Sequence, residues 1–223
     1  MMLCLLPVNQ RGMYRDLVVK KCYLPAGHTG KCQEFPYLSQ LNVVAPRVAN
    51  KIKRDATKTT GAAWASDEAG PNRIDRWVML ESDTVLLQYG INMAGLSLSV
   101  QNKLREKAAT YEDCMEVAAK LTWFAYQMPD APLCEPYTQQ YLESRFGRMV
   151  ENSTCCIVCR LPLSFSLFDN AVRGKAEIET AHKSPRQHNA QNVGFAHREC
   201  NIAQGNKTLD EFYNWIDGIL SRL

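Results

Sequence analysis

Two pairs of metal-binding side chains constrain the fold of the last third of this 223-residue chain more than any other feature. Cys156 and Cys159 are separated by two residues, and His197 and Cys200 repeat that spacing further along the chain. Three thiolates and one imidazole complete a tetrahedral zinc site, which requires the two pairs to meet in space. The sequence therefore predicts a structural zinc site, with Cys155 as an alternative to Cys156.

The segments around these pairs predict the order strand, strand, helix. The alternating run KAEIETAH and the short run VGFAH are typical of strands, whereas RECNIAQGNK and LDEFYNWIDGILSRL are typical of helices. Between and directly after the zinc pairs lie His182, Asn192 and Asn201, whose side chains can move a proton or bind a cation. This part of the chain is therefore the first candidate for a catalytic site.

The stretches CIVC, ETAHKSP, QNVGFAHREC and CNIAQGNK resemble the HNH family of nucleases in order and spacing, over about residues 151–210. The run VGFAHRECNIAQG is especially similar to the equivalent stretch of phage junction-resolving nucleases of the endonuclease VII type. The resemblance implies a zinc-stapled ββα-metal (HNH) finger that hydrolyses DNA phosphodiester bonds with the help of Mg²⁺ or another divalent cation.

The same resemblance assigns roles to individual residues. It implies that His182 is the general base, that Asn201 holds the catalytic cation through its carbonyl oxygen, and that Asn192 braces the loop so that the imidazole is correctly turned. The chain departs from the family at Ala181, where most members carry a second metal ligand. Glu179, two residues back on the same strand face, is the candidate replacement. A structural histidine and a simple helix cap are the alternatives for His182 and Asn201.

A second group of possible ligands lies near the amino terminus. Cys22, His28 and Cys32 fall within the short segment CYLPAGHTGKC. A fourth ligand would come from Cys4, from Glu34 or from elsewhere, so the segment predicts a possible second zinc site. An ordinary turn that carries free cysteines is the alternative.

Positive charge is concentrated in the first 60 residues, although the net charge of the chain is only +3. APRVANKIKRDATK predicts a basic helix that begins after Pro46 and can neutralise DNA phosphates. The loop TTGAAWASDEAGPNR that follows mixes small residues with residues that read base edges. A solvated basic face is the alternative. The predicted DNA contacts are Lys51, Arg54, Lys58, Asn72, Arg73, Arg76 and Gln204.

The whole chain predicts an α+β fold with a mainly helical scaffold. Residues 1–79 form the expected zinc-binding and DNA-recognition region, 80–150 a helical scaffold or dimerisation region, and 151–223 the nuclease domain. The helical pattern from about Leu80 to Met128 includes an expected capping box at Thr110. A short run with alternating polarity, DLVVKKCYL, is a possible strand.

These features predict a sequence-specific double-stranded DNA endonuclease similar to type II restriction enzymes of the HNH group. A junction-resolving or homing endonuclease and a non-catalytic zinc-dependent DNA-binding protein are the alternatives, the last because of Ala181. One site per chain has to cut two strands, which predicts a homodimer. No apolar run is long enough for a membrane helix and the opening MMLCLLPVNQR lacks signal-peptide features, so we expect a cytoplasmic protein without a membrane partner.

Overall fold

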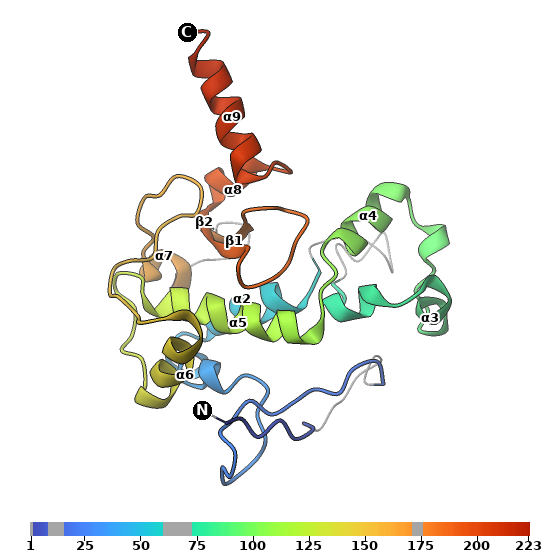
Figure 1. Ribbon diagram of the computed structural model, residues 1–223, viewed down its shortest axis with the longest axis vertical. Coiled ribbons are helices and arrows are strands. Elements are labelled where there is room, and N and C mark those ends of the chain that lie inside the picture. The colour runs from blue at the N-terminus through green and yellow to red at the C-terminus, as the bar shows by residue number, and fades with distance from the viewer. Residues whose placement is uncertain (1, 9–15, 60–72, 171–175) are drawn as a thin grey trace.

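Helices dominate the computed structural model, which describes residues 2–8, 16–59, 73–170 and 176–223 (Figure 1). A two-stranded hairpin near the carboxyl end is followed directly by a helix, so the predicted α+β class with a mainly helical scaffold is confirmed. None of the helices in these ranges has the length and apolar character needed to cross a bilayer. The elements are η1 (Pro36–Leu38), α1 (Ser39–Val44), α2 (Pro46–Thr57), η2 (Arg76–Leu80), α3 (Asp83–Gln88), η3 (Met93–Gly95), α4 (Leu98–Glu106), α5 (Tyr111–Tyr126), α6 (Pro136–Phe146), α7 (Phe165–Asp169), β1 (Ile178–His182), β2 (Val193–His197), α8 (Arg198–Gln204) and α9 (Leu209–Leu220).

Helices α2 and α5 pack against each other in the centre of the molecule. Proline at the first position of α2 fits there because that position has no hydrogen-bond acceptor for an N–H. Val48, Ile52 and Ala56 of α2 are fully buried, as the helical spacing of its apolar residues predicts. The N-cap Thr110 accepts a hydrogen bond from the main-chain N–H of Asp113, which fixes the start of α5.

The hairpin lies on one side of α5 and the N-terminal segment lies on the other, as Figure 1 shows. Strands β1 and β2 are antiparallel, and their register pairs Ile178 with His197 at one end and His182 with Val193 at the other. Strand β2 packs against α5. Both predicted strands and the predicted helix after them are therefore present.

The N-terminal segment does not contain the strand predicted for DLVVKKCYL. Its described residues form two isolated bridges, Leu3 with Pro25 and Pro7 with Lys21, and no continuous ladder. Both hydrogen bonds of each bridge are made, but between the bridges Leu5 has a positive φ of 53° and donates its N–H to the carbonyl of Cys22, which interrupts the regular pattern. The alternation in polarity was the wrong signal here, because the segment curls around a group of cysteines.

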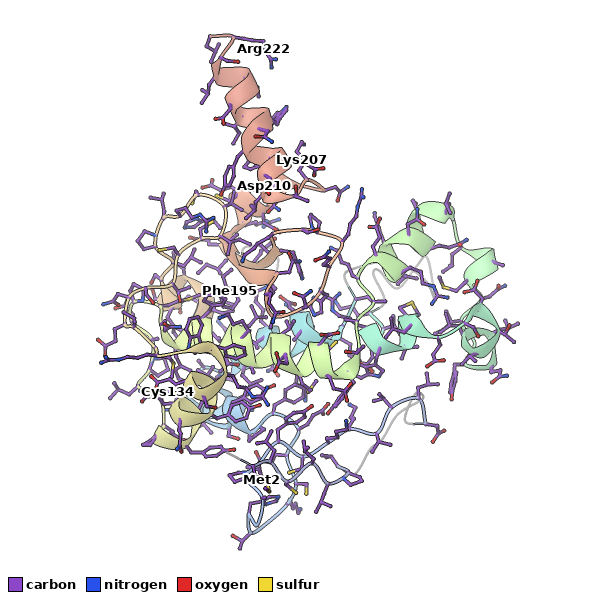
Figure 2. All side chains as sticks on the ribbon, viewed as in Figure 1. Met2, Cys134, Phe195, Lys207, Asp210 and Arg222 are labelled. Carbon is purple, nitrogen blue, oxygen red and sulfur yellow. The ribbon has the colours of Figure 1, made fainter. Side chains whose placement is uncertain are left out.

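One hydrophobic core joins all parts of the chain, from Tyr23 near the amino end to Phe212 near the carboxyl end. The predicted division into regions 1–79, 80–150 and 151–223 stays a prediction, since each region supplies residues to that core. Helix α9 begins with a capping box made by Thr208 and Glu211. Figure 2 shows that α9 extends away from the body of the molecule toward Arg222, whereas Phe212 near its start is buried in the core.

Candidate active site and metal clusters

The four predicted ligands of the C-terminal site come together. The ligand atoms of Cys156, Cys159, His197 and Cys200 all lie within 4.8 Å of one another. The last residue of β2, His197, places its Nδ1 atom 3.4 Å from Sγ of Cys159, and Cys200 follows in the first turn of α8. Cys155 is not part of the group, which resolves the choice that the sequence left open in favour of Cys156.

The loop that carries the first two cysteines is held directly against β2. The main-chain N–H of Ile157 donates to the carbonyl of Phe195 at 2.9 Å. Gly194 permits this approach, because a Cβ atom there would lie 2.3 Å from Cγ2 of Ile157. A side chain at position 194 would therefore push the two halves of the cluster apart.

The electrostatics of this cluster fit a cation. Burial opposes ionisation of Cys156, but main-chain N–H groups, including that of Cys159, outweigh it and lower the pKa of the Cys156 thiol. Burial and the neighbouring thiols raise the pKa of Cys200 to about 12. Several thiolates cannot share so small a space unless a dication offsets their charge, and Zn²⁺ is the ion that prefers this donor set.

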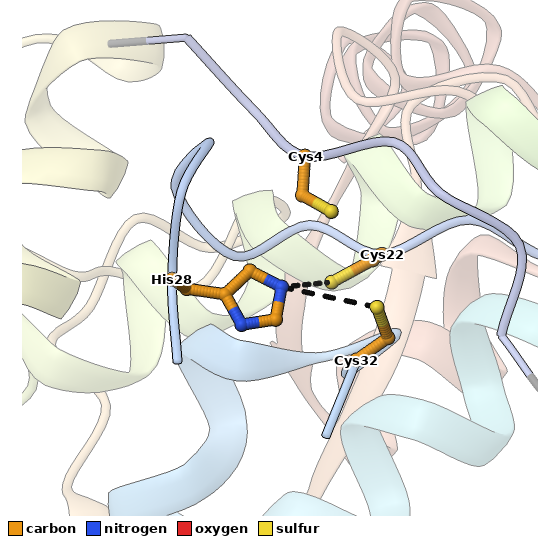
Figure 3. A group of neighbouring side chains, drawn as sticks. All are labelled: Cys4, Cys22, His28 and Cys32. Atoms are coloured by element: carbon orange, nitrogen blue, oxygen red, sulfur yellow. Dashed lines mark hydrogen bonds between the residues drawn. The ribbon is translucent and has the colours of Figure 1, made fainter. Parts of the chain in front are cut away.

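The second cluster, shown in Figure 3, contains Cys4, Cys22, His28 and Cys32, with all ligand atoms within 4.8 Å of one another. Nε2 of His28 lies 3.4 Å from Sγ of Cys22 and 3.8 Å from Sγ of Cys32. Cys4 is thus the fourth member, whereas Glu34 forms a salt bridge with a lysine. The donor set is the same as in the C-terminal cluster and fits a structural zinc ion equally well.

A pocket with a volume of about 980 Å³ opens beside the C-terminal cluster, between α2, β1 and α8. Among the described residues that line it, seven are Lys or Arg and two are acidic, which favours a polyanionic ligand. The charged residues of the lining are Arg47, Lys51, Arg54, Asp55, Arg73, Arg76, Lys107, Glu179 and Arg198.

His182, at the end of β1, lines this pocket and contacts a second histidine. Its Nε2 atom lies 2.9 Å from Nδ1 of His188, whose own Nε2 lies 2.8 Å from the carbonyl oxygen of Ala56 in α2. Burial, followed by the positive charges of Arg76 and Lys107, lowers the pKa of His182 to about 3. The imidazole is therefore neutral at physiological pH, and one of its two ring nitrogens keeps a lone pair.

Two amides hold the surroundings of His182 in place. Nδ2 of Asn192 donates to the carbonyls of Ser184 (2.7 Å) and Gln187 (2.6 Å), and its Oδ1 accepts from the N–H of Ser184, which closes the loop after β1. Nε2 of Gln204 in α8 donates to the carbonyl of His182 at 2.9 Å. The backbone at His182 is thus tied both to its own loop and to the following helix.

Glu179 and Asn201 contact each other in the lining of the pocket that His182 also lines. Nδ2 of Asn201 donates to Oε2 of Glu179 at 2.8 Å, and Nε of Arg198 lies 3.8 Å from Oε1. Ala181 is buried in the core and offers no ligand atom. A carboxylate and an amide carbonyl are the oxygen donors that Mg²⁺ prefers, so this pair fits the expected catalytic cation.

Three of the predicted DNA contacts converge on Asp55 of α2. Its carboxylate lies 2.8 Å from Nζ of Lys51, 2.9 Å from Nε of Arg54 and 3.7 Å from Nη1 of Arg73. It also accepts a hydrogen bond of 3.1 Å from the hydroxyl of Thr180 in β1. Burial opposes ionisation, but Lys51 and Arg54 outweigh it and lower the pKa of Asp55. The carboxylate therefore gathers the cations at the pocket.

Two other predicted DNA contacts are buried, with 1% of their surface exposed. The guanidinium of Arg76 donates to the main-chain carbonyls of Lys107 (2.9 Å) and Asp55 (3.0 Å). The side-chain amide of Gln204 donates to the main-chain carbonyl of His182, as described above. Neither arrangement leaves the side chain exposed for base edges or phosphates, so both residues act as supports of the pocket in this structure.

Of the two remaining predicted contacts, Lys58 is not among the described residues that line the pocket. Lys58 forms a salt bridge of 2.7 Å with Asp75. Asn72 lies outside the described residues. The cations that α2 contributes to the pocket lining are Arg47, Lys51 and Arg54.

Sequence reasoning missed three residues of this site, namely Asp55, Lys107 and His188. Asp55 follows Lys51 by four residues, a spacing that pairs opposite charges on a helix and was available as a signal. His188 occurs in the same loop as Asn192, but nothing in the sequence indicates that the loop folds back to His182 and α2.

Two comparisons with known proteins found matches to this chain. A family model described as DraIII matches residues 34–200. A solved structure described as the crystal structure of a type II restriction endonuclease is 48% identical to the chain, covers 100% of it and 98% of the other chain, and superposes with a TM-score of 0.86. No curated protein matches the chain.

Proposed function

The chain belongs to the DraIII family and is a type II restriction endonuclease, and from this premise we propose that it cleaves a specific double-stranded DNA sequence in the His182 pocket. The observation that carries the proposal is the position of a neutral, half-buried imidazole in a strongly basic pocket that Glu179 and Asn201 also line. Family membership favours the restriction class over the junction-resolving and homing alternatives.

We infer that His182 is the general base. A neutral imidazole can take a proton from a water molecule that attacks the scissile phosphorus, and the pocket is large enough to admit a phosphodiester. Asn192 and Gln204 fix the backbone that carries the ring. This arrangement matches the one-metal HNH mechanism that the sequence resemblance implies.

Glu179 and Asn201 would hold the catalytic divalent cation. When bound, such an ion offsets the charge of the pentacovalent transition state and of the departing oxygen. Glu179 would supply the carboxylate that Ala181 cannot supply, and Asn201, which contacts Glu179, would supply its carbonyl oxygen. Their mutual hydrogen bond, made by the amide nitrogen of Asn201, holds the two side chains in contact.

The basic residues of α2 would bind the DNA backbone. Arg47, Lys51 and Arg54 line the pocket along one helix, with Asp55 between them as an anchor. Contacts of this kind position the duplex without reading its sequence. One pocket per chain cuts one strand, so we further propose a twofold homodimer on a palindromic site.

The two Cys3His clusters would bind structural zinc and would take no part in the chemistry. Each already has four protein donors, and a site with four protein donors keeps no open position for water or substrate.

Replacement of His182 tests the proposal most directly. We expect His182→Ala to lower the single-turnover cleavage rate at least about a hundredfold, which is typical for loss of a positioned general base. Zinc content, circular dichroism and DNA affinity should stay near those of the unmodified protein. Gln187→Ala is a matched control, because this exposed side chain lies in the same loop and its carbonyl bond to Asn192 is retained. Wild-type cleavage by His182→Ala would refute the assignment.

The same assay separates the cation ligands from the base. Asn201→Ala and Glu179→Gln should each raise the Mg²⁺ concentration needed for half-maximal cleavage, since each removes or weakens one oxygen donor. His182→Ala should lower the rate at every Mg²⁺ concentration. A rate loss in Glu179→Gln that excess Mg²⁺ or Mn²⁺ leaves unchanged would count against Glu179 as a ligand.

A further inference from the structure

His188 is a buried histidine outside the pocket lining, placed between His182 and helix α2. Its side chain is 4% exposed, and both of its ring nitrogens have partners. One partner is His182, the proposed base, and the other is the main-chain carbonyl oxygen of Ala56. A histidine in this position does not touch substrate, so any effect on the reaction passes through His182.

The two hydrogen bonds determine which nitrogen carries each proton. A carbonyl oxygen can only accept, so Nε2 of His188 must donate to Ala56. A neutral imidazole carries one N–H, which makes Nδ1 of His188 an acceptor and Nε2 of His182 the donor to it. Nδ1 of His182 is then the unprotonated nitrogen of the ring.

The neutrality of His188 follows from its surroundings. Burial, and after it the positive charge of Arg76, lowers the pKa of His188 to about 2. Donation to Ala56 favours the charged form, but it is the smaller effect. A doubly protonated His188, which would reverse the direction of the bond to His182, is therefore strongly disfavoured at the pH of the cell.

We propose that His188 is a positioning residue that holds His182 in the Nε2–H tautomer, so that Nδ1 is the atom that takes the proton from the attacking water. The proposal deepens the function proposed above and rests on it. Since His188 is itself bonded to α2, the same contact sets the orientation of the base relative to the basic residues of that helix. A wrong tautomer would leave the base with a proton where it needs a lone pair.

Two replacements of His188 separate positioning from simple packing. His188→Leu fills the space but removes the acceptor, whereas His188→Asn places Oδ1 near the position of Nδ1 and can still accept from Nε2–H of His182. We expect His188→Leu to lower the single-turnover cleavage rate at least about tenfold at saturating DNA and Mg²⁺. His188→Asn should recover the rate to within about threefold of the unmodified protein, with DNA affinity unchanged in both. Equal rates for the two variants would overturn the proposal.

The tautomer can be observed without any activity. The chain has four histidines, and two of them belong to the Cys3His clusters, so ¹⁵N-histidine labelling of the zinc-loaded protein gives few signals. We expect the ¹⁵N shifts of His182 to show a protonated Nε2 and a bare Nδ1 in the unmodified protein and in His188→Asn, but not in His188→Leu. A protonated Nδ1 in the unmodified protein would refute the proposal even if the variants do not fold. Wild-type cleavage by His182→Ala would instead refute the base, whatever the tautomer.

Discussion

The two Cys3His clusters have the same donors but are built on different supports. In the C-terminal cluster, His197 ends a paired strand, Cys200 lies in a helix, and the cysteine loop is bonded to β2. In the N-terminal cluster, Cys4 and Cys22 lie in a segment that has only isolated bridges within the described residues. The C-terminal cluster is thus supported by a strand and a helix. The N-terminal cluster lies in an irregular segment, so its own ligands have to hold that segment together.

The clusters also differ in what they adjoin. Asn201 follows Cys200 directly, so the C-terminal cluster fixes the start of the helix that carries a proposed cation ligand. The N-terminal cluster adjoins the far side of the core, where the N–H of Lys21 donates to the hydroxyl of Tyr111 in α5. We therefore propose that the two clusters, with the same donors, have different roles: one supports the catalytic geometry and the other the stability of the scaffold.

The largest expected effect comes from breaking the C-terminal cluster. Cys200→Ser should lose one zinc ion per chain and abolish cleavage, because the ligand lies beside Asn201 on α8. Cys32→Ser should also lose one zinc ion but retain cleavage chemistry on bound DNA at low temperature, with a lower melting temperature. Metal analysis, thermal unfolding and single-turnover cleavage measure the difference.

Cys134→Ser is a matched control, since this cysteine is outside both clusters and should change neither zinc content nor cleavage. If Cys32→Ser abolishes cleavage as completely as Cys200→Ser while remaining folded, the assignment of different ends to the two clusters is wrong.

A smaller effect should appear on the α2 side of the pocket. Helix α2 is bonded to the part of the chain that carries the C-terminal cluster. The carboxylate of Asp55 accepts a hydrogen bond from Thr180, and the carbonyl of Ala56 accepts one from His188. Arg54→Ala should weaken DNA binding by about tenfold and lower the slope of log affinity against log salt by about one, as expected for one lost phosphate contact. Titrations at several salt concentrations give both quantities.

Lys53→Ala is the control on the same helix, because its ammonium group lies over the ring of Phe35 and it does not line the pocket. Its salt slope should equal that of the unmodified protein. An unchanged slope in Arg54→Ala would place that guanidinium away from the phosphates.

The sequence predicted the C-terminal cluster almost completely because its information is local. Regular ligand spacing and two short strands bring Cys156 and His197 together without knowledge of the rest of the fold. The N-terminal cluster was predicted only in part, since a distant residue, Cys4, completes it through an irregular path. The basic residues of the sequence correctly indicated the polar side of α2. Sequence alone could not show that Arg54 is exposed whereas Arg76, in η2, is buried.

The pairing of His188 with His182 shows the limit most clearly. It depends on a loop that folds back to a helix more than a hundred positions earlier in the chain, and its bond to Ala56 uses a main-chain atom. A carbonyl oxygen has no signature in a sequence, so the contact has to be seen in three dimensions.

The smallest expected effect is on the pH dependence of the free energy of unfolding. It distinguishes the pair His182 and His188 from the histidines of the two Cys3His clusters. The pKa of His188 is lowered in the folded state to about 2, while an unfolded histidine has a pKa near about 6.5. Below about pH 6.5 the unfolded chain therefore binds a proton that the folded chain excludes, and stability falls as pH falls, by about 1.4 kcal/mol per pH unit for each such histidine. His188→Asn should reduce the slope of unfolding free energy between pH 6 and 5 by about that amount.

Urea unfolding with zinc in excess measures this slope, and loss of zinc ligands to protons affects both proteins equally and cancels in the difference. Cys32→Ser should keep the full histidine contribution, because its cluster lies across α5 from the pair. If His188→Asn and the unmodified protein have the same slope, His188 is protonated in the folded state. Nδ1 of His188 would then donate to Nε2 of His182. The contrast between the neutral pair His182 and His188 and the ligand histidines of the two clusters would disappear.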